Sequence, residues 1–456
     1  MADVKIAFIG AGSAVFAMDM VRDLCLTPGL GGSSVVLMDI DRERLDAVYS
    51  MAKRYAAKVG SRIRFRETIK RNEALEGSDF VIDTVLVGGH YEQEAVRAVG
   101  EKHGYYRGVE AVEFNMVSDY YTTFGGYHQL KFFADLAQDM EDLCPGAWLI
   151  DVANPECEAG TLLARKSKIK VVGYCHGYKE YRDICATLGI DASKVDFQVA
   201  GFNHNIWLTR LAYNGRDCYP LIDEWIRRSA ERYWRNHVSS DVFDTQMSRA
   251  AVDMYDMYGL FPVGDTVRSG SWKYHYDLKT KKYWYGKFGG PDSEIGWKRY
   301  LKELEVSTET VMGVAHASPS SLIKELPPRM SDEDVVQFID SVVNDRGARF
   351  VLDVRNDGLI RGLSDDVAVE VPVMVDRKGV HKERIGKMPR RLVDMALIPR
   401  QVRLEMAMEA FIHGDKGILL EILFRDPRTR SDRQAKEVAE EILDLPFNKD
   451  AKRHYS

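Results

Sequence analysis

The sequence has few cysteines, no long apolar run and no excess of basic residues, and each absence excludes a class of protein. Six cysteines scattered over 456 residues do not make a disulfide framework, and we expect them to be reduced thiols. No stretch approaches the roughly 18 apolar residues that span a bilayer. A net charge of −6 provides no basic face for phosphates. We therefore expect no nucleic-acid partner and no membrane association.

The beginning of the chain also lacks the charged segment and long apolar stretch of a signal peptide. Residues 1–12, MADVKIAFIGAG, instead predict the first strand of the fold. Together with the reduced cysteines, this indicates a cytoplasmic protein. The sequence contains no internal repeat and no low-complexity linker.

The composition is that of a globular protein, with 45% apolar and 29% charged residues, and 456 residues are too many for one typical domain. Apolar runs alternate with helical spacing in the first part of the chain. The runs lie at residues 5–12, 34–41, 79–89, 147–155 and 169–177, and helices are expected at 13–26, 42–60 and 127–145. This pattern predicts an α/β fold, with a doubly wound, Rossmann-like parallel sheet of the lactate and malate dehydrogenase kind over residues 1–196.

From residue 197 onward the pattern changes, which indicates a second domain. We expect a strand pair at 197–217, a helical stretch at 225–260, an aromatic loop at 264–290, antiparallel strands within 349–376 and a helical pair at 399–426 split near Gly414. Residues 197–456 are therefore predicted to form an α+β domain for substrate and metal binding and for subunit contacts.

A glycine-containing loop at the end of the first strand predicts a dinucleotide site. Gly10 permits a tight turn, Gly12 allows close approach of a pyrophosphate, and Ser13 and Ala14 open the helix whose N–H groups bind that anion. The third glycine position of the usual motif holds Val15. Asp39 ends the second strand, where it can bind the adenosine ribose, and an acid at this position favours NAD over NADP.

Polar side chains follow the later strands at the edge where a doubly wound sheet binds ligands. Asn154 follows the fourth strand, Cys175 and His176 follow the fifth, and His204 follows the next apolar run. A thiolate and an imidazole, with water or substrate oxygens, would make an open catalytic metal site. Taken singly, each of these residues is more often a core or surface residue than a metal ligand.

Many ordered segments resemble one known family. They include GAGSAVF, LMDID, VGGH, ANPE, CHGY, VAGFNH, GDTVRSGSWKYH, DSEIGW and VEVPVMVD. Over nearly its full length the chain resembles glycoside hydrolase family 4, the NAD- and manganese-dependent glycosidases, and in particular the alpha-glucosidase branch. The resemblance implies NAD and Mn²⁺ or another divalent metal as cofactors, a small-molecule glycoside as substrate, and a homodimer or homotetramer.

The resemblance also implies an elimination mechanism outside the usual scheme of two carboxylates. Hydride leaves C3 of the sugar for NAD, a base removes the C2 proton, the aglycone is eliminated, water adds and the ketone is reduced again. Cys175 and His204 match the metal ligands, and Asn154 matches a substrate-binding residue. Asp265 matches the C2 base. His176 and Asp119 match proton donors or substrate contacts, and Arg268 would bind a sugar oxygen or neutralise developing charge.

Sequence features favour an unphosphorylated sugar. His176 stands where the phosphosugar branches have asparagine or aspartate, and Leu86 stands where they tend to have arginine. Cations in the aromatic loop, namely Arg268, Lys273 and Lys279, leave alpha-glucuronides and alpha-galacturonides open, and alpha-galactosides are a further alternative. Two other classes remain. One is an NAD-dependent 2-hydroxyacid-type dehydrogenase, which would consume NAD. The other is a non-catalytic NAD sensor.

Overall fold

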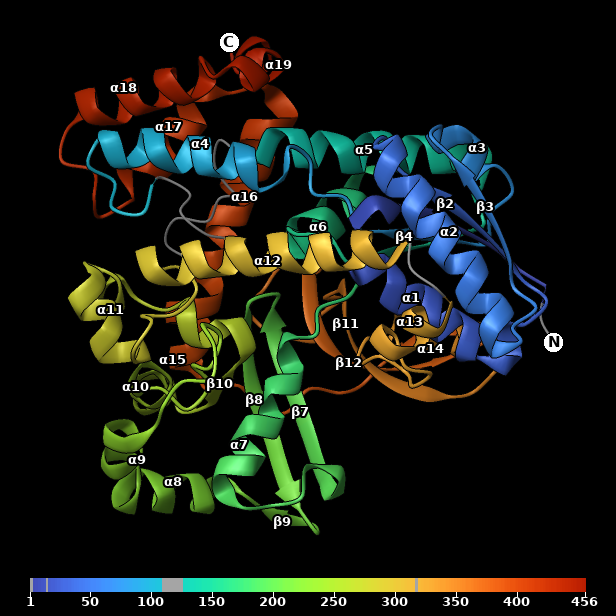
Figure 1. Ribbon diagram of the computed structural model, residues 1–456. Coiled ribbons are helices and arrows are strands. Elements are labelled where there is room, and N and C mark those ends of the chain that lie inside the picture. The colour runs from blue at the N-terminus through green and yellow to red at the C-terminus, as the bar shows by residue number, and fades with distance from the viewer. Residues whose placement is uncertain (1–2, 14, 109–125, 316–318) are drawn as a thin grey trace.

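The computed structural model describes residues 3–13, 15–108, 126–315 and 319–456 (Figure 1). In these residues thirteen strands form one sheet, and helices cover both of its faces. The strands are β1 (Lys5–Ile9), β2 (Ser34–Met38), β3 (Arg64–Thr68), β4 (Phe80–Asp83), β5 (Trp148–Asp151), β6 (Lys170–Gly173), β7 (Val195–Phe202), β8 (Asn205–Tyr213), β9 (Arg216–Asp217), β10 (Phe261–Val263), β11 (Ala348–Arg355), β12 (Ala368–Asp376) and β13 (Gly379–Lys382).

The first six strands lie parallel in the order β3-β2-β1-β4-β5-β6. This is the strand order of a dinucleotide-binding fold, and it confirms the predicted fold class. The five predicted strands correspond to β1, β2, β4, β5 and β6. The sequence analysis missed β3, because this edge strand, RFRET, carries charged residues between its few apolar ones and lacks the apolar run of a central strand.

The second part of the sheet is antiparallel. β11 lies beside β6, and β12, β7, β8 and β10 follow in that order. The expected strand pair at 197–217 and the antiparallel strands within 349–376 are therefore both present. The expected boundary at residue 196 falls inside β7, and the division into domains of residues 1–196 and 197–456 stays a prediction.

The helices are more numerous than the sequence pattern suggested, because several are short. They are α1 (Val15–Leu26), α2 (Arg42–Val59), α3 (Arg71–Leu75), α4 (Gly89–Lys102), α5 (Gly126–Leu143), α6 (Glu156–Lys166), α7 (Tyr181–Leu188), α8 (Tyr219–Arg228), α9 (Ala230–Asn236), α10 (Arg249–Tyr258), α11 (Leu278–Tyr285), α12 (Glu294–Ala315), α13 (Pro319–Glu325), α14 (Val335–Asn344), α15 (Arg390–Leu392), α16 (Ile398–His413), α17 (Lys416–Phe424), α18 (Asp432–Leu443) and α19 (Lys449–His454). The predicted aromatic loop at 264–290 contains α11. The helical pair near the C-terminus is confirmed, with Gly414 in the left-handed conformation at the end of α16.

Alternation along the strands assigns the helices to two layers. In β1, Ile6 and Phe8 belong to the core shared with α1 and α2, whereas Ala7 and Ile9 belong to the core shared with α3 and α5. Successive side chains of a strand point to opposite faces, so both faces of the parallel strands are buried. The long helix α12 crosses the middle of the molecule (Figure 1), and Arg54 of α2 donates a hydrogen bond of 2.6 Å to the carbonyl of Ala315 at its end.

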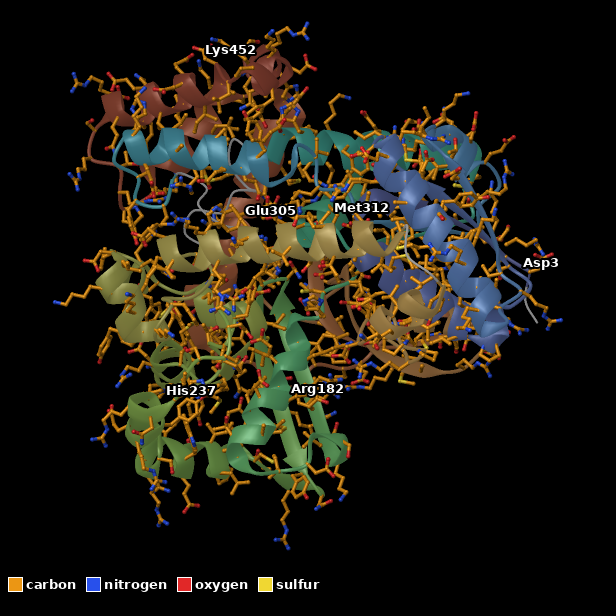
Figure 2. The ribbon with its side chains drawn as sticks, viewed as in Figure 1. Asp3, Arg182, His237, Glu305, Met312 and Lys452 are labelled. Carbon is orange, nitrogen blue, oxygen red and sulfur yellow. The ribbon has the colours of Figure 1, made fainter. Side chains whose placement is uncertain are left out.

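Local sequence explains where α2 begins and ends. Asp41 caps α2 by accepting a hydrogen bond from the backbone N–H of Arg44, and Gly60 ends it with φ 70. Such a cap contributes about 1 kcal/mol, and glycine is favoured where the chain leaves a helix in the left-handed conformation. Charged side chains at the ends of the chain, such as Asp3 and Lys452, extend from the surface (Figure 2). None of the helices in the described ranges combines the length and apolarity needed to cross a membrane.

Candidate active site

The predicted glycine loop lies at the carboxyl end of β1 and leaves no room for side chains. Gly10 has φ 86, and a Cβ there would come within 2.8 Å of Thr84 Oγ1. A Cβ on Gly12 would lie 2.6 Å from Asp39 Oδ2. The backbone N–H of Gly12 donates a 2.6 Å hydrogen bond to the same carboxylate oxygen. The loop and Asp39 are therefore held together, and both glycines are required sterically.

A cavity of about 920 Å³ opens beside this loop. Its size is in the range of about 300–1,000 Å³ typical of sites for small ligands and cofactors. It is lined by residues of the loop, of the strand ends and of α12, among them Gly10, Gly12, Ser13, Asp39, Asn72 and Thr308. Leu86 also lines this cavity. Ala14 lies outside the described residues. The loop, the acid and the cavity together fit a bound dinucleotide.

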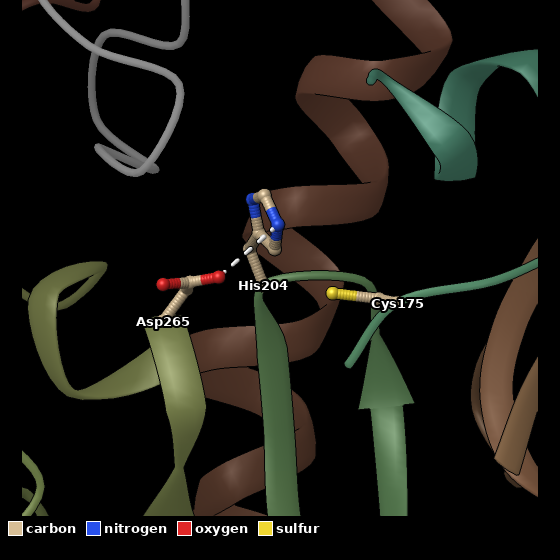
Figure 3. Close-up of side chains that lie close together, drawn as sticks. All are labelled: Cys175, His204 and Asp265. Carbon is tan, nitrogen blue, oxygen red and sulfur yellow. Dashed lines mark ion pairs between the residues drawn. The ribbon is translucent and has the colours of Figure 1, made fainter. Parts of the chain in front are cut away.

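Three side chains from separate parts of the chain meet at the same edge of the sheet (Figure 3). Ligand atoms of Cys175, His204 and Asp265 lie within 4.8 Å of one another, and His204 Nε2 is 3.3 Å from an oxygen of Asp265. An ion bonded at about 2.0–2.3 Å to each ligand would hold such atoms about 3–4 Å apart. The three residues therefore fit a divalent metal ion with open positions. The sequence analysis expected Cys175 and His204 as ligands and Asp265 as a base beside them.

Each of these residues lies in a loop or turn that directly follows a strand. Cys175 follows β6, and Asp265 lies in a 3₁₀ turn, Gly264–Arg268, that follows β10. His204 is in the two-residue turn between β7 and β8, where Phe202 pairs with Asn205. Its φ of 59 is a conformation that costs a non-glycine residue about 1–2 kcal/mol. A strained residue of this kind is often found at functional sites.

Glycines bring the Cys175 and Asp265 segments into contact. Gly264 has φ 63, and a Cβ there would lie 2.5 Å from the carbonyl oxygen of Gly177. A Cβ on Gly177 would be 3.5 Å from Cys175 Sγ and 3.6 Å from Asp265 Oδ2. The two backbones thus pack directly on each other, which is what brings Asp265 close to the thiol.

Arg268 lies behind Asp265. It is fully buried, forms an ion pair with Asp265 Oδ1, and donates a 3.2 Å hydrogen bond to Thr245 Oγ1. Its observed contacts therefore position Asp265, and a direct contact of Arg268 with the sugar stays a prediction. Lys273, also considered for substrate binding, forms an ion pair with Asp253, and Lys279 lies on the exposed side of α11.

The surroundings of the thiol favour its protonated form. Burial raises the pKa of Cys175 well above its ordinary value, and the nearby carboxyl groups of Glu156 and Glu370 act in the same direction. A metal ion bound by the thiol would displace this proton. The site thus has the donor set of a metal centre.

His176 contacts a partner that the sequence analysis did not anticipate. Its Nδ1 lies 3.0 Å from an oxygen of Glu333, and its side chain is 70% exposed. The hydrogen bond with Glu333 raises the pKa of His176, so the imidazole holds a proton more readily. Asn154 lies between β5 and α6 at the same sheet edge. Asp119 lies outside the described residues.

A row of buried carboxyl groups runs across the sheet toward both sites. Asp83 of β4 is opposite Asp151 of β5, and Asp353 of β11 is opposite Glu370 of β12. Gly173 of β6 joins the two pairs, being opposite both Asp151 and Asp353. Residues in one register row point to the same face. Burial raises the pKa of Asp83 and of Asp353 to about 7, so these two carboxyl groups keep a proton at higher pH than ordinary aspartates do.

The sequence contained a signal for this row. FVID, WLID and FVLD each place an aspartate after three apolar residues, and Glu370 interrupts the apolar run VAVEVPVMV. An acid within a buried strand is unusual, because a charged group is costly to bury without a partner. The signal was present, but only the register of the strands shows that the acids form one row.

Family models match nearly the whole chain. The model described as "Family 4 glycosyl hydrolase" matches residues 5–189, and the model described as "Family 4 glycosyl hydrolase C-terminal domain" matches residues 199–429.

Curated proteins of three specificities resemble the chain to the same degree, and each alignment covers both proteins almost completely. The chain is 24% identical to an alpha-galactosidase of Bacillus subtilis (97% of each protein), to an alpha-galacturonidase of Thermoanaerobacter italicus (97% of this chain, 96% of the relative) and to an alpha-glucosidase of Erwinia rhapontici (96% and 97%).

Solved structures share the fold. A 6-phospho-alpha-glucosidase from gut microorganisms, in complex with NAD and Mn²⁺, aligns with a TM-score of 0.76 at 17% identity, over 99% of both chains. A 6-phospho-beta-glucosidase from Thermotoga maritima, with NAD and glucose-6-phosphate, aligns with a TM-score of 0.72 at 19% identity, again over 99% of both chains.

Proposed function

The chain belongs to family 4 of the glycosyl hydrolases, and we propose that it hydrolyses unphosphorylated alpha-glucosides using NAD and a divalent metal ion such as Mn²⁺. The observation that carries this proposal is the presence of two sites at one edge of one sheet. The glycine loop follows β1, and the Cys175 segment follows β6, three strand spacings away. Three spacings are about 14 Å, a separation that an extended dinucleotide can bridge.

The two groups would supply different chemistry. Bound NAD would accept and return a hydride, and a bound divalent ion would polarise sugar oxygens as a Lewis acid. Gly10, Gly12, Ser13 and Asp39 would hold the dinucleotide. Cys175 and His204 would bind the ion, and the carboxylate of Asp265 would lie beside it. Solved relatives crystallised with NAD and Mn²⁺ support both assignments.

The remaining residues have roles in binding the sugar and moving protons. Asn154 would donate hydrogen bonds to sugar hydroxyls beside the ion. Asp265 would take the proton from C2, with Arg268 fixing the direction of its carboxylate. His176, paired with Glu333, would hold a proton for the leaving group, and Asp119 remains a second candidate for that role.

Two of the three cations considered for a uronide have partners within the protein, which favours a neutral sugar. A carboxylate at C6 would require a cation directed at it. Arg268 is engaged with Asp265 and Thr245, and Lys273 with Asp253. Relatives named as an alpha-galactosidase and an alpha-galacturonidase are as similar to the chain as the alpha-glucosidase is. Alpha-galactosides and alpha-galacturonides are therefore the second candidates.

Exposed apolar side chains support a subunit contact. Met395 and Val402 are 54% and 48% exposed, and they line a cavity of about 570 Å³ with Met254, Tyr258 and Met406. Exposed apolar groups of this kind favour burial against another chain. We propose a homodimer or homotetramer on this basis. The cytoplasmic location also stays a prediction.

Turnover in deuterated water tests the mechanism. The enzyme is supplied with NAD, Mn²⁺, a reductant and an aryl alpha-glucoside, in parallel with the corresponding galactoside and galacturonide. We expect release of glucose with deuterium at C2, and no net change in NAD. Hydrolysis without deuterium at C2 would contradict the elimination route. Accumulation of NADH in proportion to product would instead support a dehydrogenase.

A further inference from the structure

The turn that carries His204 needs a restraint outside itself. His204 has φ 59, a conformation that is uncommon for residues other than glycine. The turn is only two residues long, with Asn203 and His204 between β7 and β8. A displacement of this turn would move the imidazole of His204 away from Cys175 and Asp265. The neighbouring residue, Asn203, makes side-chain contacts with elements outside the turn.

Asn203 bridges two buried carboxyl groups with one amide nitrogen. Its Nδ2 donates hydrogen bonds to Glu156 Oε2 at 3.0 Å and to Glu370 Oε2 at 3.3 Å. All three side chains are at least 95% buried. The two N–H donors of a primary amide are thus directed at two acceptors on different elements, the first turn of α6 and strand β12.

The same two carboxyl groups are tied to the strand that leads to Cys175. Glu370 is opposite Gly201 of β7 and opposite Asp353 of β11. Asp353 is in turn opposite Gly173, two residues before Cys175. Glu156 lies two residues after Asn154, at the start of α6, which packs on β6, β11 and β12. The Asn203 amide therefore joins the His204 turn to the segments that carry Cys175 and Asn154.

We propose that Asn203 is a positioning residue for the metal centre, and that by bridging Glu156 and Glu370 it holds the His204 imidazole toward Cys175 and Asp265. This inference rests on the proposed function, because it requires Cys175 and His204 to bind a divalent ion beside Asp265. Partners that orient a metal ligand from outside the coordination sphere typically change metal affinity about 10–100-fold when they are removed.

Metal binding by the metal-free full-length protein tests the proposal directly. Asn203→Ala is titrated with Mn²⁺ while free Mn²⁺ is followed by electron paramagnetic resonance, and with Co²⁺ while the visible absorption of the bound ion is recorded. We expect Mn²⁺ affinity to fall about 10–100-fold and the Co²⁺ spectrum to change. NAD affinity should be unchanged, because the glycine loop is remote from this turn.

A matched control separates positioning from general destabilisation. Asn356 is also a fully buried asparagine, and its Nδ2 donates to the backbone carbonyls of Ile360 and Ser364 in the loop after β11. Asn356→Ala should lose thermal stability as Asn203→Ala does, but keep the Mn²⁺ affinity and Co²⁺ spectrum of the natural protein. Loss of metal binding by both variants to the same extent would overturn the proposal.

A second pair of variants covers the case in which Asn203→Ala does not fold. Glu370→Gln keeps an oxygen acceptor at the same reach, whereas Glu370→Ala removes it. We expect Glu370→Gln to retain Mn²⁺ affinity and Glu370→Ala to lose it. Unchanged Mn²⁺ affinity in both Asn203→Ala and Glu370→Ala would overturn the positioning role of Asn203. Unchanged affinity in Cys175→Ser would instead show that the ion binds elsewhere, and so overturn the proposed function itself.

Discussion

The candidate dinucleotide site and the candidate metal site lie at the same edge of the sheet, the dinucleotide end and the metal end, and they are built in opposite ways. At the dinucleotide end, Gly10, Gly12 and Asp39 come from consecutive elements, and a single hydrogen bond between Gly12 and Asp39 fixes the loop. At the metal end, Cys175, His204 and Asp265 come from three loops spread over 90 residues of sequence. Their meeting depends on antiparallel strands that join the sheet from the later part of the chain.

The difference lies in how each site is restrained. The glycine loop is restrained locally, by steric limits at two glycines and by the strand beside it. The metal end is restrained by contacts between distant segments: the Gly177–Gly264 backbone contact, the Arg268–Asp265 ion pair and the Asn203 bridge. We therefore expect changes at one end to leave binding at the other end nearly intact.

The largest effect is expected from Cys175→Ser. Loss of the thiolate should abolish tight Mn²⁺ binding, and kcat/KM should fall about 10³-fold or more, because Lewis-acid stabilisation contributes several kcal/mol. NAD affinity should be retained. Isothermal titration with Mn²⁺ and with NAD, together with glycosidase assays, measures all three.

Cys185→Ser is the matched control for that variant, since Cys185 is fully buried in a different apolar core. It should lose stability without losing Mn²⁺ affinity. Full turnover by Cys175→Ser would show that the thiol is not a ligand of the metal ion.

An intermediate effect is expected from Asp39→Ala. Removing a carboxylate that would bind the ribose hydroxyls should weaken NAD binding about 10–100-fold, the equivalent of about 1.5–3 kcal/mol for hydrogen bonds to a charged group. Mn²⁺ affinity should stay within experimental error of the natural protein. Fluorescence titration with NADH and calorimetry with Mn²⁺ provide the two readouts.

The control for Asp39→Ala is Asp415→Ala, which removes another acid that accepts a backbone hydrogen bond, at the start of α17. It should lower thermal stability and leave NAD affinity unchanged. Equal weakening of Mn²⁺ and NAD binding in Asp39→Ala would contradict the independence of the two ends.

The smallest effect concerns the row of acids between the two ends. Burial raises the pKa of Asp83 to about 7 from an ordinary value of 3.8. Between these values the folded protein keeps a proton that the unfolded chain releases, so stability falls as pH rises through this window. One proton corresponds to about 1.4 kcal/mol per pH unit. Asp83→Asn should therefore reduce the loss of stability between pH 5 and pH 6 by about that amount.

Urea unfolding at both pH values measures this difference, and Asp415→Asn, which removes an exposed acid far from the row, is the comparison. An unchanged pH dependence in Asp83→Asn would show that Asp83 is ionised in the folded protein. Mn²⁺ and NAD affinities should be unaffected at either pH.

Much of the parallel half of the fold was predictable because its signals are local. Apolar runs such as FVID and WLID mark central strands, and Asp41 and Gly60 mark the ends of α2. β3 was missed because RFRET has the composition of an exposed edge. The helices between residues 225 and 260 were predicted only as a helical stretch, since nothing in their periodicity indicated the break between α9 and α10.

The residues of the candidate site could be predicted from the sequence, but the residues that contact and position them could not. Cys175, His204 and Asp265 were expected from strand ends and from the family resemblance, and the structure brings them together. Glu333, Asn203 and Glu370 were not anticipated. Each contacts its partner across a long separation in sequence, and no spacing rule relates such residues.

The sequence by itself determined the parallel dinucleotide fold and the glycine loop, because periodicity, glycine conformation and helix capping act between neighbours in the chain. Only the tertiary structure decided that a thiol, an imidazole and a carboxylate share one site, and that Asp83, Asp151, Asp353 and Glu370 form one row. Strand register and the packing of distant backbones fix those positions, and both are properties of the folded chain as a whole.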